Sequence, residues 1–302
     1  MDAVKKAERM LCIGSSDIAA IAKLIPKWRT PLDVYLEKIG EGPPQEESER
    51  MYFGKVLEEV VAQEYVRRTG KGVHCVQETI YHDTLPFLGA NVDRLINDGQ
   101  GILECKTADA YVKDQWGTPG TDQIPEAYLL QVAHQAKVYE NRGITYVDIA
   151  VLIGGNEFRI YRYIPNKALE DKITAIASNF WNNHVIPRVP PGPMTSDDLI
   201  TMYPKEGDSA AIATDEAILI LNALKDVRGE MALLSKQEED YKNQVRSLIA
   251  SAARLIDSDG RRLASWTSQS TTRFDTTTFK ETHPDLYTTF CKTTDSRVLR
   301  IA

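Results

Sequence analysis

The strongest constraint on the fold of this chain is a pair of strand-like segments joined by a tight turn. Residues 88–96 and 102–107 are short, largely apolar runs, and Asn97-Asp98-Gly99 lies between them. Asparagine, aspartate and glycine tolerate the backbone angles of a tight turn, so this triplet is a strong hairpin signal. The sequence therefore predicts two adjacent antiparallel strands at this point.

The predicted hairpin brings charged side chains together. Successive side chains of a strand point to opposite faces, so Glu104 and Lys106 share one face while Leu103 and Cys105 occupy the other. The preceding strand is antiparallel and can place Asp93 across from Glu104. Two carboxylates and a lysine are thus expected at one spot on a sheet.

This trio suits hydrolysis of a phosphodiester. Asp93 and Glu104 offer the hard oxygen ligands that Mg²⁺ prefers, and the backbone carbonyl of Cys105 is a further candidate ligand. The metal would acidify water and offset charge on the phosphate. Lys106 would orient or deprotonate that water, or stabilise developing negative charge. Because a glutamate and a lysine two residues apart are common on strands, a solvated strand face remains the alternative interpretation.

A predicted helix before the strands carries a third carboxylate. Apolar residues recur at helical spacing over residues 50–69, and Glu58 lies on this helix. Glu58 can approach the metal from the side. The alternative is an exposed helix acid, a role that the neighbouring Glu59 would share.

A second predicted helix, over residues 125–140, carries polar side chains on an otherwise mostly apolar face. Gln131 and His134 lie on this face and are expected to point toward the sheet. A buried glutamine must be hydrogen-bonded, so Gln131 contacts either a catalytic group or a structural partner between helix and sheet. His134 is interpreted as a packed histidine.

The remaining pattern predicts the fold class. Helices are expected within residues 3–39 and over 167–184, and strands over 73–81, 146–153 and 157–164. This order predicts an α/β (α+β) fold with a mixed central sheet flanked by helices. Prolines between residues 187 and 193 indicate a boundary, with one domain over 1–195 and an extension over 196–302.

The extension has a different pattern. Between residues 210 and 255, apolar residues recur at alternating steps of three and four, which predicts a long helix or a helical hairpin. Such a stripe is an interaction surface or simply packs on the core. Asp259-Gly260, between Leu255 and Leu263, predicts a small β-hairpin.

Composition narrows the class of protein. The 302 residues carry a net charge of -7, which disfavours nonspecific coating of duplex DNA but leaves room for a locally basic cleft. The four cysteines are widely spaced, which argues against zinc and iron–sulfur sites. We find no apolar signal core, no bilayer-spanning stretch and no nucleotide-binding P-loop, so we expect a cytoplasmic, ATP-independent protein.

Taken together, these motifs resemble those of the PD-(D/E)xK nucleases, and specifically the YqaJ-like phage recombinase (lambda exonuclease) family. The resemblance covers residues 8–187 and rests on Arg9 with Ser16, GKVLE at 54–58, VD at 92–93, LECK at 103–106 and QVAHQ at 131–135. Val92 stands where the family usually has proline. The resemblance implies a restriction-endonuclease-like core.

The resemblance also implies roles for individual residues. Asp93 and Glu104 match metal ligands, the Cys105 carbonyl matches a backbone ligand, and Lys106 matches the catalytic lysine. Glu58 and Gln131 match the family's helix glutamate and helix glutamine. Arg9 and Ser16 match a pocket for the 5′-phosphate of a DNA end, and paired guanidinium hydrogen bonds suit that ligand. The helix predicted to start after Ser16 would add free N–H groups.

At the level of function, the resemblance implies a Mg²⁺-dependent 5′-to-3′ exonuclease, with Mn²⁺ as a substitute. The enzyme would act on double-stranded DNA ends and leave 3′ tails for phage-type recombination in a bacterial host. A homotrimeric ring and a single-strand annealing protein are the implied partners. Two alternatives remain: an endonuclease or DNA-repair nuclease of the same superfamily, and a non-catalytic DNA-binding assembly module.

Overall fold

The computed structural model describes residues 3–43, 47–293 and 297–301. The chain divides into two compact units, Met1–Met202 and Tyr203–Ala302. Helix α7 (Ser196–Met202) follows the boundary predicted after residue 195 and belongs to the first unit. A hydrogen bond from Thr30 Oγ1 to Asp198 Oδ1 (2.8 Å) ties α7 to the start of α3.

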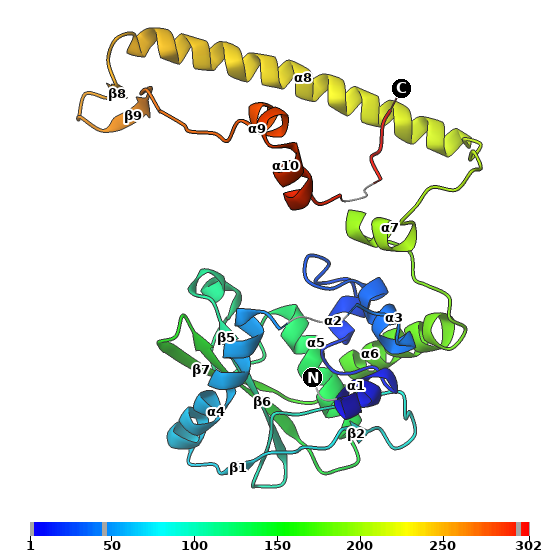
Figure 1. The fold of residues 1–302 in the computed structure, drawn as a ribbon. Coiled ribbons are helices and arrows are strands. Elements are labelled where there is room, and N and C mark those ends of the chain that lie inside the picture. The colour runs from blue at the N-terminus through cyan, green and yellow to red at the C-terminus, as the bar shows by residue number, and fades with distance from the viewer. Residues whose placement is uncertain (1–2, 44–46, 294–296, 302) are drawn as a thin grey trace. The chain divides into compact units, whose positions relative to one another are not determined.

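The first unit follows the predicted order of helices and strands (Figure 1). Its helices are α1 (Ala3–Met10), α2 (Ile18–Ile21), α3 (Pro31–Ile39), α4 (Glu49–Thr69), α5 (Glu126–Val138) and α6 (Lys167–Phe180). Its strands are β1 (Val73–His74), β2 (Ile80–Tyr81), β3 (Gly89–Ala90), β4 (Arg94–Ile96), β5 (Gly101–Ala108), β6 (Tyr146–Ile153) and β7 (Glu157–Tyr163). A 3₁₀ segment (Ala110–Gln115) follows β5, and a π-helical turn (Trp181–Val185) extends α6.

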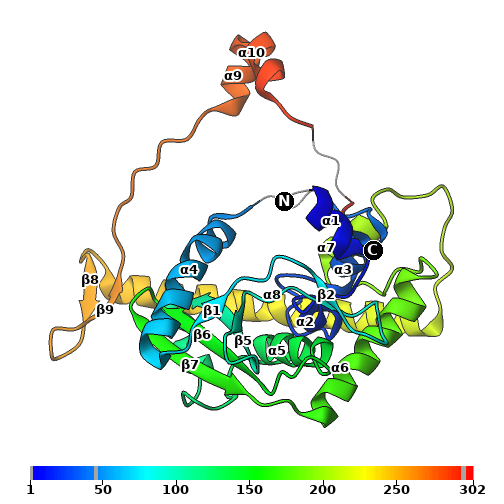
Figure 2. The same cartoon turned by 90° about the horizontal axis from the view of Figure 1, so that it is seen from below.

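The central sheet has five strands in the order β1-β4-β5-β6-β7. β5 and β6 are parallel, and the other neighbours are antiparallel. On one face α4 packs Val61 and Tyr65 against Leu103 and Cys105. On the other face α5 lies between the sheet and α6 (Figure 2). The predicted fold class, a mixed sheet flanked by helices, is confirmed.

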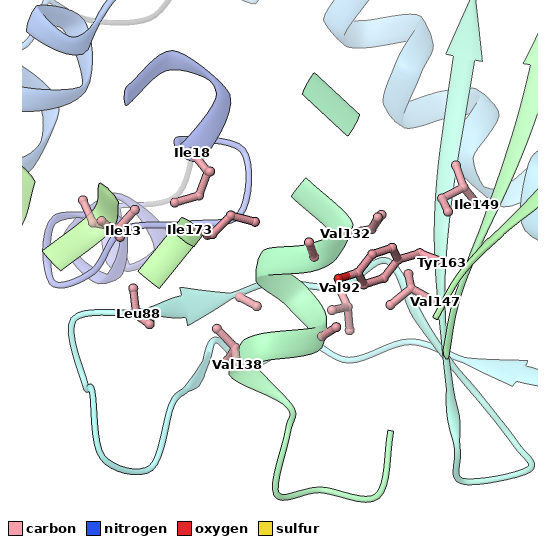
Figure 3. Packing of buried hydrophobic residues seen from close by; sticks show 14 of the residues in the cluster. Ile13, Ile18, Leu88, Val92, Val132, Val138, Val147, Ile149, Tyr163 and Ile173 are labelled. Atoms are coloured by element: carbon pink, nitrogen blue, oxygen red, sulfur yellow. The ribbon is translucent and has the colours of Figure 1, made fainter. Parts of the chain in front are cut away.

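The larger core surrounds α5. In Figure 3, α5 with Val132 and Val138 stands between Val147 and Ile149 of the sheet on one side and Ile173 of α6 on the other. All five side chains are buried, and each contributes roughly 1.5–3 kcal/mol to the free energy of folding by leaving water. This packing fixes where the polar side chains of α5 meet the sheet.

The predicted hairpin is present, but its first strand is interrupted. β4 and β5 pair with Arg94 opposite Leu103, and Gly99 in the connecting turn has a φ of 73°. The strand predicted over 88–96 is divided into β3 and β4, because β3 pairs with β2 in a separate two-stranded ladder. The strand predicted over 73–81 is divided in the same way. Asp93 thus lies one residue before the β4–β5 ladder.

The second unit contains α8 (Asp215–Ile249), a hairpin of β8 (Arg254–Ile256) and β9 (Arg262–Ser265), and two short helices, α9 (Thr276–Thr282) and α10 (Pro284–Phe290). Of the two alternatives for residues 210–255, the structure has the single long helix. Thr214 caps its start by accepting the N–H of Ala217. In the part of the chain that the structure describes, no helix is both long and apolar enough to span a bilayer.

His134 generates a prediction on stability. Its side chain is fully buried on α5, and its Nε2 lies 3.0 Å from the Gly89 carbonyl oxygen. Burial lowers the pKa of His134 from 6.5 to about 4. Between these two pH values the imidazole is protonated in the unfolded chain but neutral in the folded protein. This stabilising difference is complete above pH 6.5 and is lost as pH falls toward 4.

We therefore expect the unfolding free energy of the wild type to fall by about 2 kcal/mol more than that of His134→Gln between pH 7 and pH 5. Glutamine can keep a hydrogen bond to Gly89 but does not titrate. Urea unfolding at both pH values measures the difference. Equal losses in the two proteins would show that the folded state does not exclude the proton from His134.

Candidate active site

Asp93, Glu104 and Lys106 meet at one spot on the sheet, as the hairpin pattern predicted. Because Arg94 is opposite Leu103, the next position along the antiparallel pair places Asp93 across from Glu104. Asp93 Oδ2 accepts the backbone N–H of Cys105 at 2.7 Å. Lys106 Nζ lies 2.5 Å from Glu104 Oε1. The three charged groups are therefore held by a single hairpin.

Two glutamines of α5 hold the Glu104 carboxylate from above the sheet. Gln131 Nε2 donates to Glu104 Oε1 and Gln135 Nε2 donates to Glu104 Oε2, each at 2.6 Å. Glu104 is only 2% exposed, and a carboxylate that leaves water needs such partners. One amide on each oxygen fixes the orientation of the carboxylate plane.

The carboxylates of Asp93 and Glu104 repel each other in this buried site. Burial and the nearby Glu104 raise the pKa of Asp93 to about 8, in spite of Lys106 and the Cys105 N–H, which lower it. For Lys106, burial lowers the pKa, but attraction to Glu104 and Asp93 outweighs burial and raises it above the usual lysine value. Lys106 is thus a stable ammonium. Its Nζ also lies 5.2 Å from the centre of the Tyr128 ring, where a cation–π attraction adds to its stability.

Glu58 lies near the pair but has a different partner. Its Oε1 accepts from Arg94 Nη1 at 2.6 Å, while Arg94 Nη2 donates to Glu59 at 2.9 Å. Arg94 also donates to the carbonyl of Asp93. The structure therefore links Glu58 to the site through a buried arginine, and Glu58 contributes to the raised pKa of Asp93 through its charge.

The carboxylate pair fits a divalent cation. Asp93 and Glu104 are hard oxygen donors that repel each other in a buried place, and a cation beside them would relieve that repulsion. Within the described residues, no group of three or more His, Cys, Asp or Glu side chains could hold a metal. Mg²⁺ commonly takes one or two protein carboxylates and completes its shell with water and substrate phosphate. The carbonyl of Cys105 remains a candidate ligand.

A small cavity lies at the predicted phosphate pocket and reaches Gln131, the glutamine that bonds Glu104. Arg9, Ser15 and Ser16 line one part of it, and Gln131, which donates to Glu104, lines another. Its volume is about 140 Å³, below the ~300 Å³ at which pockets for whole small molecules begin. The buried hydroxyl of Ser15 has no hydrogen-bond partner in the described part of the chain. The cavity suits a compact polar group such as a phosphate.

An ion cluster fixes Arg9 at this cavity. Arg9 Nε donates to Glu37 Oε1 (2.9 Å), and Lys38 Nζ donates to the Arg9 carbonyl (2.8 Å). Lys38 and Arg29 each contact the buried Asp17 at 2.6 Å. Burial alone would raise the pKa of Asp17, but Lys38 and Arg29 hold it well below its usual value. The cluster thus pairs three cations, Arg9, Arg29 and Lys38, with Asp17 and Glu37, and Asp33 adds a further negative charge near Arg29.

A helix starts after Ser16, as predicted, but it is too short to offer a helix N-terminus as a phosphate site. α2 is a single turn, and its N-cap residue Asp17 makes no side-chain hydrogen bond to it. Asp17 Oδ2 instead accepts the N–H of Gly14 (2.8 Å), and its carboxylate serves the ion cluster. The phosphate-binding potential of this loop therefore rests on Arg9 and the serine hydroxyls.

Sequence reasoning missed several of these contacts. Gln135 follows Gln131 by one helical turn, so the same helix face could have identified it. Arg94 and Lys38 gave no such signal, because their partners come from distant parts of the chain. The interpretation of His134 as a packed core histidine agrees with its complete burial.

The chain is similar to one known protein over nearly its whole length and to a family model over part of it. A family model described as a YqaJ-like viral recombinase domain matches residues 6–142. The protein "Uncharacterized protein YqaJ" of Bacillus subtilis (strain 168) is 33% identical over an alignment of 301 positions, and the alignment covers 96% of this chain and 91% of that protein.

Two solved structures match part of the chain. One is an alkaline exonuclease (LHK-Exo) from Laribacter hongkongensis, 20% identical, with a TM-score of 0.48 over 61% of this chain and 92% of that chain. The other is a phage related exonuclease from Haemophilus somnus 129PT, 12% identical, with a TM-score of 0.46 over 59% of this chain and 96% of that chain.

The ion cluster predicts a large effect of Lys38→Met on stability. The substitution leaves the buried Asp17 with one cation fewer and frees the Arg9 carbonyl. Breaking a buried ion pair on one side typically costs about 3 kcal/mol or more. Chemical denaturation of wild type and variant measures this loss.

Lys167→Met is the matched control, because Lys167 pairs with Asp171 on the exposed surface. The control should unfold at the same denaturant concentration as the wild type. A Lys38 variant as stable as this control would contradict a structural role for the cluster.

Proposed function

Because the chain belongs to the YqaJ-like viral recombinase family, we propose that it is a magnesium-dependent exonuclease that digests one strand of linear double-stranded DNA from 5′ to 3′. The products would be 3′ single-stranded tails for phage-type homologous recombination. One observation carries the proposal: a single cavity contacts both Arg9–Ser16 and Gln131, the residue that holds Glu104. A terminal phosphate in this cavity would be separated from Glu104 by the side chain of Gln131.

Each residue of the site has a separate role in the proposed hydrolysis. Asp93, Glu104 and the carbonyl of Cys105 would hold Mg²⁺, for which Mn²⁺ should substitute. When bound, the ion supplies Lewis-acid chemistry: it offsets charge on the phosphate and acidifies water. Gln131 and Gln135 keep the Glu104 carboxylate in one orientation, so that little reorganisation is needed during reaction.

Lys106 acts as a fixed positive charge in this proposal. Its raised pKa favours the ammonium form, which stabilises negative charge as the phosphodiester is cleaved. Tyr128 and Glu104 restrict the ammonium to one side of the site. Arg9, Ser15 and Ser16 would bind the terminal phosphate and so direct the enzyme to a 5′ end.

The assembly and the partner follow from the family alone. We propose a homotrimeric ring around the DNA and cooperation with a single-strand annealing protein that coats the exposed strand. A ring suits a chain with a net charge of -7, because encirclement can retain DNA where electrostatic attraction is weak.

The proposal is tested by comparing linear duplex DNA with closed circular duplex of the same sequence, each with Mg²⁺. An exonuclease that needs an end should degrade the linear form and leave the circle intact. Cleavage of the circle would favour an endonuclease. No cleavage of either substrate would favour a non-catalytic DNA-binding module.

Lys106→Ala should reduce cleavage on the order of 10³-fold, because the site loses its fixed cation. DNA binding should be largely retained, since most of the binding surface is unchanged. Lys113→Ala is the control, because this exposed lysine pairs with Glu157 outside the trio, and its rate should match the wild type. Equal rates in all three proteins would refute the assignment of Lys106.

Removal of the 5′-phosphate should slow digestion by the wild type by roughly 10-fold or more, the effect expected when a charge-assisted hydrogen bond is lost. Arg9→Ala should digest phosphorylated and unphosphorylated ends at nearly the same rate. Arg67→Ala, which removes an exposed arginine paired with Glu64, should keep the preference. A wild type indifferent to the phosphate would eliminate the pocket assignment.

A further inference from the structure

The buried arginine Arg94 has no part in the hydrolysis proposed above, although it directly follows Asp93 on the chain. Its side chain is only 9% exposed, and a guanidinium keeps its positive charge in proteins. It donates hydrogen bonds to Glu58, to Glu59 and to the backbone carbonyl of Asp93. The rigid fork of an arginine fixes the groups that it bonds in this way.

The side chain of Arg94 lies on the side of the sheet that α4 covers. Arg94 is opposite Leu103 in the β4–β5 ladder, and paired residues of adjacent strands share a face. Leu103 packs against α4, the helix that carries Glu58. Glu104 is bonded from the other face, by glutamines of α5. The guanidinium therefore connects the acid of α4 to the hairpin that carries the carboxylate pair.

A single nitrogen of Arg94 joins Glu58 to Asp93. Nη1 donates to Glu58 Oε1 and to the Asp93 carbonyl oxygen, each at 2.6 Å. The side chain of Glu58 is 32% exposed, so water screens its charge only in part. Among the described residues, Glu58 does not form a group with Asp93 and Glu104 that could hold a metal. Its carboxylate is bonded to Arg94 instead.

We propose that Arg94 is a positioning residue that neutralises Glu58 and keeps its charge from the cation site. Two carboxylates, and not three, then determine how tightly the site binds a divalent ion. The inference rests on the proposed function in one respect: it takes Asp93 and Glu104 as the place where the ion binds.

Arg94 and Glu58 have opposite effects on a nearby cation. The guanidinium repels a divalent ion and the carboxylate attracts it, and such forces are strong where little water separates the charges. In the wild type the two effects offset each other. Removal of either partner leaves the charge of the other uncompensated, whereas removal of both restores the balance.

Binding of Mn²⁺ to the full chain without DNA tests the inference independently of cleavage. The electron paramagnetic resonance signal of free Mn²⁺ falls as the ion binds, so a titration gives the affinity. Arg94→Met should bind Mn²⁺ about tenfold tighter than the wild type, because Glu58 loses its counter-ion. Glu58→Gln should bind about tenfold more weakly, because the charge of Arg94 is left uncompensated. Since Glu58→Gln keeps Arg94, the inference stays testable even if Arg94→Met does not fold.

The double variant separates neutralisation from direct ligation. If Arg94 and Glu58 act as a neutral pair, Arg94→Met combined with Glu58→Gln should bind Mn²⁺ within about twofold of the wild type. If Glu58 is itself a ligand of the ion, the double variant should bind as weakly as Glu58→Gln. That second result would overturn the inference.

Two further variants serve as controls. Arg94→Lys keeps the positive charge and should bind Mn²⁺ nearly as the wild type does, although it loses the arginine fork. Glu59→Gln removes the other carboxylate that Arg94 bonds. Glu59 is 59% exposed and is bonded through Nη2, not through the nitrogen that reaches Asp93. Its removal should change the affinity little, because exposed charges are well screened.

The outcomes distinguish this inference from the proposed function. Equal Mn²⁺ affinity in the wild type, Arg94→Met and Glu58→Gln would show that the ion pair only stabilises the fold, and would leave the proposed metal site in place. A gain in Arg94→Met that persists after Glu104→Gln is added would locate the ion elsewhere and overturn the inference. No Mn²⁺ binding in any of the proteins would overturn both the inference and the proposed metal dependence.

Discussion

The burial of Glu104 is the constraint on which the site depends. A carboxylate at the centre of a sheet costs free energy unless its oxygens are bonded, and here Gln131, Gln135 and Lys106 share that task. Asp93, across the hairpin, adds a second carboxylate whose pKa rises because of burial and of Glu104. The fold therefore brings two carboxylates to one buried place, where the proposed cation would offset their repulsion. The apolar packing of α5 is what allows both glutamines to reach the same carboxylate.

Helix α5 connects the carboxylate pair with the cavity at Arg9 and Ser16. Gln131 bonds Glu104 and also lines the cavity that Arg9 and Ser16 share. Arg9 is held there by Glu37 and, through its carbonyl, by Lys38. The candidate phosphate pocket and Glu104 of the carboxylate pair are thus joined through one amide side chain. This arrangement gives a physical reason for a preference for DNA ends in the proposed function.

The features of the site that depend on local sequence pattern were predicted correctly. Strand alternation placed Glu104 and Lys106 on one face, and the turn at Asn97-Asp98-Gly99 placed Asp93 opposite Glu104. The interruption of the strand before Asp93 was not predicted, because the pairing of β2 with β3 depends on long-range contacts. The partners of Glu58 and Asp17 were missed for the same reason: Arg94 and Lys38 lie far from them along the chain. Periodicity specifies which face a side chain occupies but not which distant side chain it meets.

The central claim is that the carboxylate pair, with Mg²⁺, removes nucleotides from the 5′ end. Release of label from linear duplex DNA, labelled at either the 5′ or the 3′ end of one strand, tests it most directly. The account predicts that the 5′ label is released first, and that chelation of Mg²⁺ or Glu104→Gln stops release. Earlier release of the 3′ label, or release that persists after chelation, would contradict it.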